Sequence, residues 1–92
     1  MIVTRVRFED FDRFWNTFSG VGAAKRAEHG SRGARVLRNA DDPQEAIVVF
    51  DWDREGFEAF MDDPEAPEIM SSAGLQGRPE PTFVDPQDEL AS

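Results

Sequence analysis

The sequence predicts an α+β fold in which a four-stranded antiparallel sheet carries two helices on one face. Two observations lead to this prediction. Strand-like and helix-like hydrophobic periods follow one another in the order βαββαβ within 92 residues, and a chain of this length forms a single domain. This order of elements places both helices on the same side of the sheet. The other face then has no cover within the chain, which predicts that a second copy of the protein covers it.

The first strand and the first helix are marked by a change of hydrophobic period. Residues 2–8 alternate between apolar and polar sides, as in a strand, and the acidic residues 9–10 suit the N-terminus of a helix. The apolar side of this helix comprises Phe11, Phe14, Trp15 and Phe18. Gly20 and Gly22 predict a bend within the helix, and Gly30 predicts its end.

The central part of the chain predicts a hairpin. Residues 35–38 form the second strand, and residues 40–44 contain the Asp and Pro that favour a turn. Residues 46–52 form the third strand, in which Ile47 to Phe50 are apolar without a break. Such a run indicates a strand that is buried on both faces, so we expect both faces of the sheet to be covered here.

The second helix is expected to be interrupted. Asp53 is its predicted N-cap, and its apolar side comprises Phe57, Phe60 and Met61. Proline fits only at helix starts and breaks. The helix should therefore stop near residues 62–63, before Pro64, restart near Pro67 and end at Gly74.

The chain ends in a short strand and a polar tail. Residues 82–84 are the predicted last strand. The single ferredoxin-like α+β domain is therefore expected to span residues 1–85, and residues 86–92 form an acidic C-terminal tail that has no reason to be ordered unless a partner holds it.

Composition excludes several classes of function. Acidic residues outnumber basic ones 19 to 10, giving a formal net charge of −9. Such a surface repels phosphate groups, so neither nucleic acid nor an anionic membrane is an expected partner. The chain has no cysteine, which excludes disulfides and a thiolate nucleophile. With no signal peptide and no long apolar stretch, a cytoplasmic protein is expected.

Several stretches have a recognisable form. They are the strand ending in Trp52, the run from Phe57 to Pro64 with its Asp-Pro break, residues 70–74, and the Pro-rich residues 79–83. Together with residues 2–8 they resemble the dimeric α/β-barrel superfamily, and within it the antibiotic-biosynthesis-monooxygenase-like proteins. The resemblance implies a homodimer in which two sheets pack face to face into a barrel. It also implies a pocket between each sheet and its own helices.

Members of this superfamily differ in activity. Some oxidise polyketide-like aromatic molecules with molecular oxygen and without metal or flavin; others cyclise or isomerise small molecules, and others degrade haem. The haem-degrading members combine an Asn on the first strand, a Trp after the third strand and a His on the second helix. Trp52 is present here, but residues 2–8 contain no Asn and residues 57–74 contain no His. We therefore reject haem degradation.

Aromatic residues are the candidate substrate-binding residues, because pockets for apolar ligands are lined by aromatic side chains with few polar groups. The candidates are Trp15, Phe18, Phe50, Trp52 and Phe60. The same side chains would form an ordinary core if they filled the space between helices and sheet completely. Trp52 also matches the tryptophan that the resembling proteins carry at the end of the third strand.

His29 is the only histidine and the only candidate for a catalytic base, since imidazole titrates near neutral pH. Its position beside Gly30 equally predicts an exposed residue that complements the end of the helix. One histidine without cysteine does not form a usual metal site, and no Gly-rich phosphate loop is present. No metal or other cofactor is therefore expected.

The arginines of the strands are expected to pair with acidic residues within the sheet or across the dimer. They are Arg5, Arg7, Arg35 and Arg38, with Asp51 and Asp53 as nearby acids. The alternative is that one of them holds an anionic or enolate substrate, because the guanidinium fork pairs well with oxyanions.

Two functions are compatible with these observations. The first is a cofactor-independent monooxygenase, or a related cyclase or isomerase, acting on a small aromatic or polyketide-like molecule. The alternative is a non-catalytic dimeric α/β-barrel protein with a binding or stress-associated role. A cavity of roughly a few hundred Å³ between helices and sheet would favour the enzyme, and complete filling of that space would exclude it.

Overall fold

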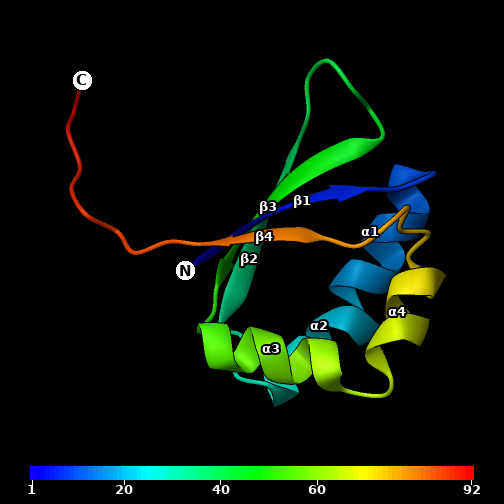
Figure 1. The fold of residues 1–92 in the computed structure, drawn as a ribbon. Coiled ribbons are helices and arrows are strands. Elements are labelled where there is room, and N and C mark those ends of the chain that lie inside the picture. Colours follow the sequence, from blue (N-terminus) through cyan, green and yellow to red (C-terminus); the bar gives the residue numbers. More distant parts are fainter.

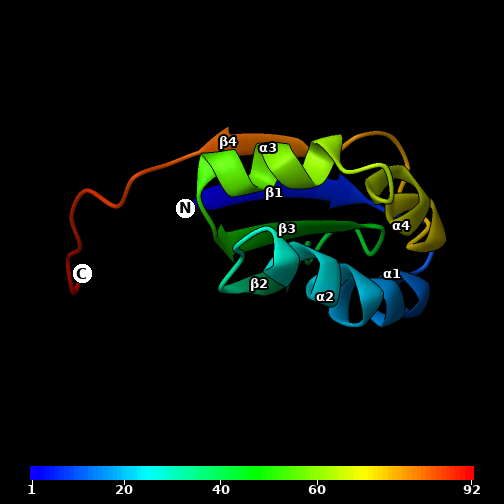
Figure 2. The same ribbon diagram turned by 90° about the horizontal axis from the view of Figure 1, so that it is seen from below.

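The computed structural model describes all residues of the chain, 1–92. Figure 1 shows a twisted sheet whose strands are antiparallel and ordered β2-β3-β1-β4. The elements in chain order are β1 (Ile2–Arg7), α1 (Phe11–Ser19), α2 (Val21–Glu28), β2 (Gly33–Arg38), β3 (Glu45–Asp51), α3 (Arg54–Asp62), α4 (Ala66–Ser72) and β4 (Glu80–Phe83). Figure 2 shows that the helices lie on one side of this sheet. The predicted ferredoxin-like α+β fold is confirmed, and none of its helices has the length and hydrophobicity that crossing a membrane requires.

Side-chain alternation separates the two faces of the sheet. On the face that meets the helices, the paired and buried residues of β1 and β3 are Ile2 and Phe50, Thr4 and Val48, and Val6 and Ala46. Successive strand residues point to opposite faces, so the residues between them form the other face. The hydrophobic core therefore lies between this sheet face and the four helices.

Both helical regions are interrupted where the sequence predicts. The carboxylate of Asp10 accepts a hydrogen bond of 2.9 Å from the Arg13 backbone N–H and caps α1. Gly20 ends α1 and begins α2, and Gly30 follows α2 with a φ of +89°, where glycine is favoured. The second region stops at residue 62 and restarts as α4, whose first turn contains Pro67.

Two strands begin two residues earlier than predicted, and one predicted helix cap does not form. β2 begins at Gly33, because Gly33 still pairs with Asp51, the last residue of β3. β4 begins at residue 80 and includes Pro81, which an edge strand tolerates. Asp53 stands at the N-cap position of α3, but its side chain makes no capping hydrogen bond; the carboxylate lies 3.5 Å from the guanidinium of Arg32 instead.

The free face of the sheet is apolar at its centre. Val3, Ile47 and Val49 are half-buried there, and Leu37 of β2 is 45% exposed. On β3 the residues facing the helices are buried, whereas the residues of the free face are only partly covered within one chain. The expected burial of β3 on both faces therefore depends on a second copy and stays a prediction.

The C-terminal residues leave the body of the protein. Residues 85–92 are exposed and have no regular secondary structure, and Figure 1 shows them extending away from the sheet beyond β4. They include three acidic side chains and the largely exposed side chain of Leu90.

Trp52 joins the end of β3 to two helices. It is only 1% exposed, and its indole N–H donates a hydrogen bond of 2.9 Å to the backbone carbonyl of His29 at the end of α2. Gly56 of α3 passes directly over this bond, and a Cβ atom there would collide with the His29 oxygen and the Trp52 ring. The close approach of the three segments thus requires glycine at residue 56.

We predict that Gly56→Ala destabilises the protein by about 1–3 kcal/mol, because the added methyl group overpacks this contact. Helix propensity alone predicts that the substitution stabilises the protein, since alanine is favoured over glycine in a helix by about 1 kcal/mol. Urea denaturation followed by circular dichroism measures the change. An unchanged or raised free energy of unfolding would contradict the close approach.

Candidate functional site

A small internal cavity lies between the helices and the core face of the sheet. Its volume is about 70 Å³, which exceeds the roughly 10–15 Å³ that one water molecule needs. The walls are largely apolar, and their polar side chains are those of Thr4, Thr17 and Arg26. The aromatic side chains therefore do not fill the interior completely. The cavity is nevertheless smaller than the volume of roughly a few hundred Å³ that would favour an enzyme.

Aromatic packing explains the small volume. The rings of Phe14 and Phe18 stack with centroids 5.0 Å apart, and the Trp52 ring meets Phe57 and Phe60 edge to face at 5.5 and 5.6 Å. Such pairs hold their rings in defined positions. The cavity is therefore the space that this aromatic packing leaves open.

A larger groove lies outside this cavity, between α1, α2 and the edge strand β2. Its volume is about 400 Å³, and its lining includes Trp15, Ala34 and Val36. Phe18 and Arg26 line both the groove and the internal cavity. These two side chains therefore form the boundary between the outer and the inner space.

The structure brings four of the five candidate binding residues together. Phe18, Phe50, Trp52 and Phe60 all line the internal cavity. Trp15 is 46% exposed and lines the outer groove, so it is not part of the core. Ligand binding by these residues stays a prediction.

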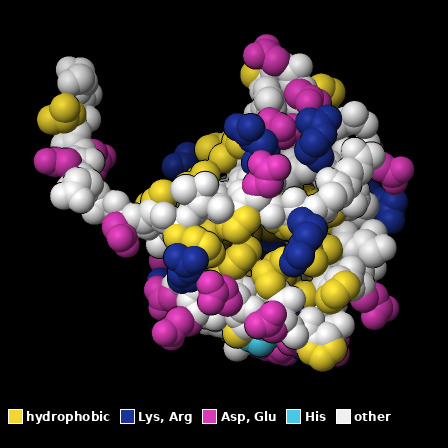
Figure 3. All heavy atoms as spheres, viewed as in Figure 1, with side chains coloured by type: hydrophobic (Ala, Val, Ile, Leu, Met, Phe, Trp, Pro, Cys, Tyr) yellow, Lys and Arg dark blue, Asp and Glu magenta, His cyan; other side chains and the backbone are white.

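Hydrophobic side chains also reach the surface between α3 and β4. Figure 3 shows them gathered there, with acidic side chains around them. Phe57, Met61 and Pro79 line both this surface groove and the internal cavity. The internal cavity therefore has neighbouring grooves on two sides.

Arg26 was not a candidate from the sequence. It is only 8% exposed, and it is the only charged residue that lines the internal cavity. Its Nη2 donates a hydrogen bond of 2.9 Å to the Phe18 carbonyl, and its guanidinium lies 3.8 Å from the centroid of the Phe18 ring. Gly22 and Arg26 lie four residues apart and hence on one side of α2, but this spacing alone does not indicate that Arg26 is buried.

Burial without a counter-ion lowers the pKa of Arg26. Loss of solvation lowers its pKa to about 10, because a low-dielectric environment disfavours the charged form. The guanidinium remains protonated at neutral pH. Gly22 leaves room beside it, since a Cβ atom there would lie 3.0 Å from Nη1 of Arg26.

His29 lies outside the internal cavity and outside the groove beside β2. Its Nε2 is 2.9 Å from the carboxylate of Asp63, which also lies 3.1 Å from the Lys25 ammonium. Lys25 makes a further ion pair of 2.8 Å with Glu65. This cluster joins the end of α2 to the break between α3 and α4, and a role of His29 as a catalytic base stays a prediction.

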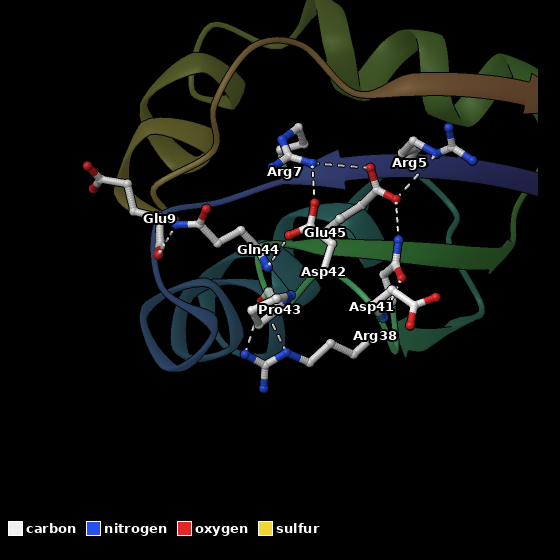
Figure 4. Close-up of polar contacts among 10 residues, drawn as sticks. Arg5, Arg7, Glu9, Arg38, Asp41, Asp42, Pro43, Gln44 and Glu45 are labelled. Atoms are coloured by element: carbon white, nitrogen blue, oxygen red, sulfur yellow. Dashed lines mark hydrogen bonds and ion pairs between the residues drawn. The ribbon is translucent and has the colours of Figure 1, made fainter.

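The strand arginines pair partly as expected and partly with other groups. Arg7 lies 2.8 Å from Asp42, and Arg38 donates two hydrogen bonds to the Pro43 carbonyl (Figure 4). Arg5 and Arg7 pair with Glu45 of the neighbouring strand β3 at 3.8 and 3.4 Å, as expected within the sheet. Asp51 and Asp53 instead pair with Arg32, which lies in the connection before β2, at 2.9 and 3.5 Å.

No cluster of three or more His, Asp or Glu side chains is arranged to hold a metal ion, and we assign no metal ligands. The lining of the internal cavity contains no histidine and no carboxylate. Within one chain, the cavity therefore offers apolar contacts, two hydroxyl groups and one cation to a ligand.

Comparisons with known proteins define the class of fold. The chain has the fold of antibiotic-biosynthesis-monooxygenase-like proteins. It is similar to SnoaB, a cofactor-independent oxygenase from Streptomyces nogalater, with a TM-score of 0.75 and 19% identity over 99% of this chain and 95% of that one. The sequence resemblance is thus confirmed at the level of the fold.

Two further solved structures are similar. Both proteins are provisionally named antibiotic biosynthesis monooxygenases. The one from Deinococcus radiodurans has a TM-score of 0.68 and 9% identity over the full length of both chains. The one from Nitrosomonas europaea has a TM-score of 0.58 and 16% identity over 89% of this chain and 94% of that one. No protein-family model and no curated protein matches the sequence.

We predict that the ion-pair cluster around Asp63 makes the free energy of unfolding depend on pH in the acidic range. The backbone N–H of Glu65, then His29 and Lys25, lower the pKa of Asp63 from 3.8 to about 2. A carboxylate whose pKa is lower in the folded than in the unfolded protein stabilises the fold at every pH above its unfolded-state pKa. This contribution is lost as the pH falls through the pKa of the folded state. Asp63→Asn should therefore reduce the free energy of unfolding at pH 5, and the difference from wild type should disappear as the pH approaches 2.

Urea denaturation at a series of pH values measures this difference. The asparagine keeps an oxygen that can accept the Glu65 N–H. The matched control is Asp62→Asn, which removes an exposed carboxylate that forms no ion pair. A difference between wild type and Asp63→Asn that does not change with pH would contradict the role assigned to the charge.

Proposed function

We propose that the protein is a cofactor-independent oxygenase of a small aromatic, polyketide-like molecule. The observation that carries this proposal is an aromatic-lined cavity, continued by an outer groove, in a fold shared along its length with SnoaB. Function resides in the site more than in the fold, so the cavity and its lining bear the greater weight.

The chemistry requires a substrate that is easily deprotonated. A CH₂ group between aromatic or carbonyl groups loses a proton, and the resulting carbanion transfers one electron to O₂. The two radicals combine to a peroxide anion, which takes a proton back from solvent to give a hydroperoxide. Loss of water from the hydroperoxide leaves a carbonyl: R₂CH₂ + O₂ gives R₂C=O + H₂O. The lining has no carboxylate or imidazole to take the proton. The role of the protein is then to desolvate the substrate and to stabilise its anion.

The same lack of an acid or base supports a second function. A non-catalytic binding protein needs only the apolar walls and a few polar groups. A cyclase or isomerase would use the same cavity without consuming oxygen. Oxygen uptake distinguishes the oxygenase from both.

We further propose that a second copy covers the free sheet face. The centre of this face is apolar, with Val3, Ile47 and Val49, and charged side chains surround it. Arg35, which is exposed and has no ion-pair partner within the chain, is positioned to find one in the second copy. A domain of this size gains stability from such association, because it buries a limited share of its own surface.

We expect the purified protein to accelerate oxygen uptake by dithranol, an anthrone with an activated CH₂ group, and to yield the corresponding quinone. An oxygen electrode and absorbance spectroscopy measure the two together. The rate should survive dialysis against EDTA and the absence of added flavin. Binding of dithranol without oxygen uptake would contradict the oxygenase and support the binding protein.

We expect Val49→Asp to shift the protein from dimer to monomer, because a buried unpaired carboxylate at the centre of an interface is costly. Light scattering coupled to size-exclusion chromatography measures the mass at micromolar concentration. The control is Ala24→Asp on the exposed side of α2, which should leave the mass unchanged. A wild-type protein that is folded and monomeric would refute the proposed assembly.

A further inference from the structure

We propose that Arg26 binds an oxyanion of the ligand, so that the protein recognises planar aromatic molecules in their phenolate or enolate form. This inference rests on the proposed function insofar as an aromatic molecule occupies the cavity and groove. It adds the charge state of the ligand and the residue that recognises it.

The charge of Arg26 has no partner within the chain. No carboxylate lies within ion-pair distance of its guanidinium, and its one hydrogen bond goes to a backbone carbonyl. A buried charge without a counter-ion is expensive to maintain, and contact with the Phe18 and Phe50 rings offsets only part of this cost. The arrangement is therefore incomplete without an anion.

The free donors of Arg26 are within reach of a ligand. The guanidinium and Nε carry five N–H groups, and only Nη2 has a hydrogen-bond partner. No side-chain nitrogen or oxygen that is fully enclosed in the protein lacks a partner. The unpartnered donors of Arg26 are therefore accessible to solvent, at the boundary between the internal cavity and the groove beside β2.

The surroundings favour an anion despite the net charge of −9. No carboxylate lines the internal cavity or the groove beside β2. The groove has a second cation, Arg32, which is already paired with Asp51. Arg26 is thus the unpaired cation at the point where the two spaces meet.

The geometry suits a flat aromatic oxyanion. The guanidinium lies against the Phe18 ring at 3.8 Å, which leaves its edge for hydrogen bonds in the plane. A guanidinium edge binds oxyanions with two parallel N–H groups. The aromatic rings around it would contact the ring system of the ligand, and Gly22 allows the close approach of the Arg26 guanidinium, since a Cβ atom there would lie 3.0 Å from Nη1.

The test compares 7-hydroxycoumarin, whose phenol and phenolate differ in absorbance and fluorescence, with 7-methoxycoumarin, which cannot ionise. Wild-type protein should lower the apparent pKa of the bound hydroxyl relative to free 7-hydroxycoumarin. Above that pKa, Arg26→Met should weaken binding of 7-hydroxycoumarin by about ten- to a hundredfold, the range for hydrogen bonds to a charged group. Binding of 7-methoxycoumarin should change by less than about threefold, since this probe has no oxyanion and is held by apolar contacts alone.

Two further variants separate binding from folding. Arg26→Lys keeps the positive charge and should retain part of the pKa shift. Arg54→Met removes an exposed cation on α3 and should leave both probes unaffected. The shift on wild-type protein needs no variant, so the test stands even if Arg26→Met does not fold.

The outcomes distinguish the two proposals. If 7-methoxycoumarin binds and the pKa of bound 7-hydroxycoumarin is unchanged, the role of Arg26 is overturned while the aromatic site stands. If neither probe binds at millimolar concentration, the aromatic site itself is refuted, and the role of Arg26 with it.

Discussion

The hydrogen bond from the Trp52 indole to the His29 carbonyl is the contact on which the arrangement of the helices depends. It connects the end of β3 to the end of α2, and α3 can cross it because residue 56 is glycine. One buried polar group thereby fixes three segments that are distant in the sequence. The indole satisfies its only donor in this way, as a buried tryptophan must.

The interrupted helices follow from the shape of this core. A straight helix would leave the twisted sheet, whereas breaks at Gly20 and before α4 let both helical regions bend around the internal cavity. The cost of each break is reduced by local contacts. Arg26 reaches back to the Phe18 carbonyl across the first break, and Asp63 accepts the Glu65 N–H at the second. Polar groups at the breaks thus hold the apolar walls of the cavity in place.

The sequence is informative about the sheet and the helix breaks for a simple reason. The alternation of residues 2–8 and the prolines after Asp63 act through local geometry, which neighbouring residues determine. The environment of Trp15 and Arg26 depends instead on how each helix is rotated about its axis. Trp15 shares a helical side with Phe14 and Phe18, yet it lies at the margin of that side and faces the groove. Arg26 is buried because Gly22 and the edge strand leave a space that no periodicity in the sequence indicates.

Helix α2 differs from the other helices in what it contributes to folding. Its buried residues are Gly22 and Arg26, and it supplies no side chain to the hydrophobic core or to the apolar residues packed against it. Segments with little apolar burial open locally at a lower free energy than the rest of a domain. Amide hydrogens of α2 should therefore exchange with solvent faster than those of β1 and β3, and α2 is the segment whose transient opening would admit a molecule to the interior.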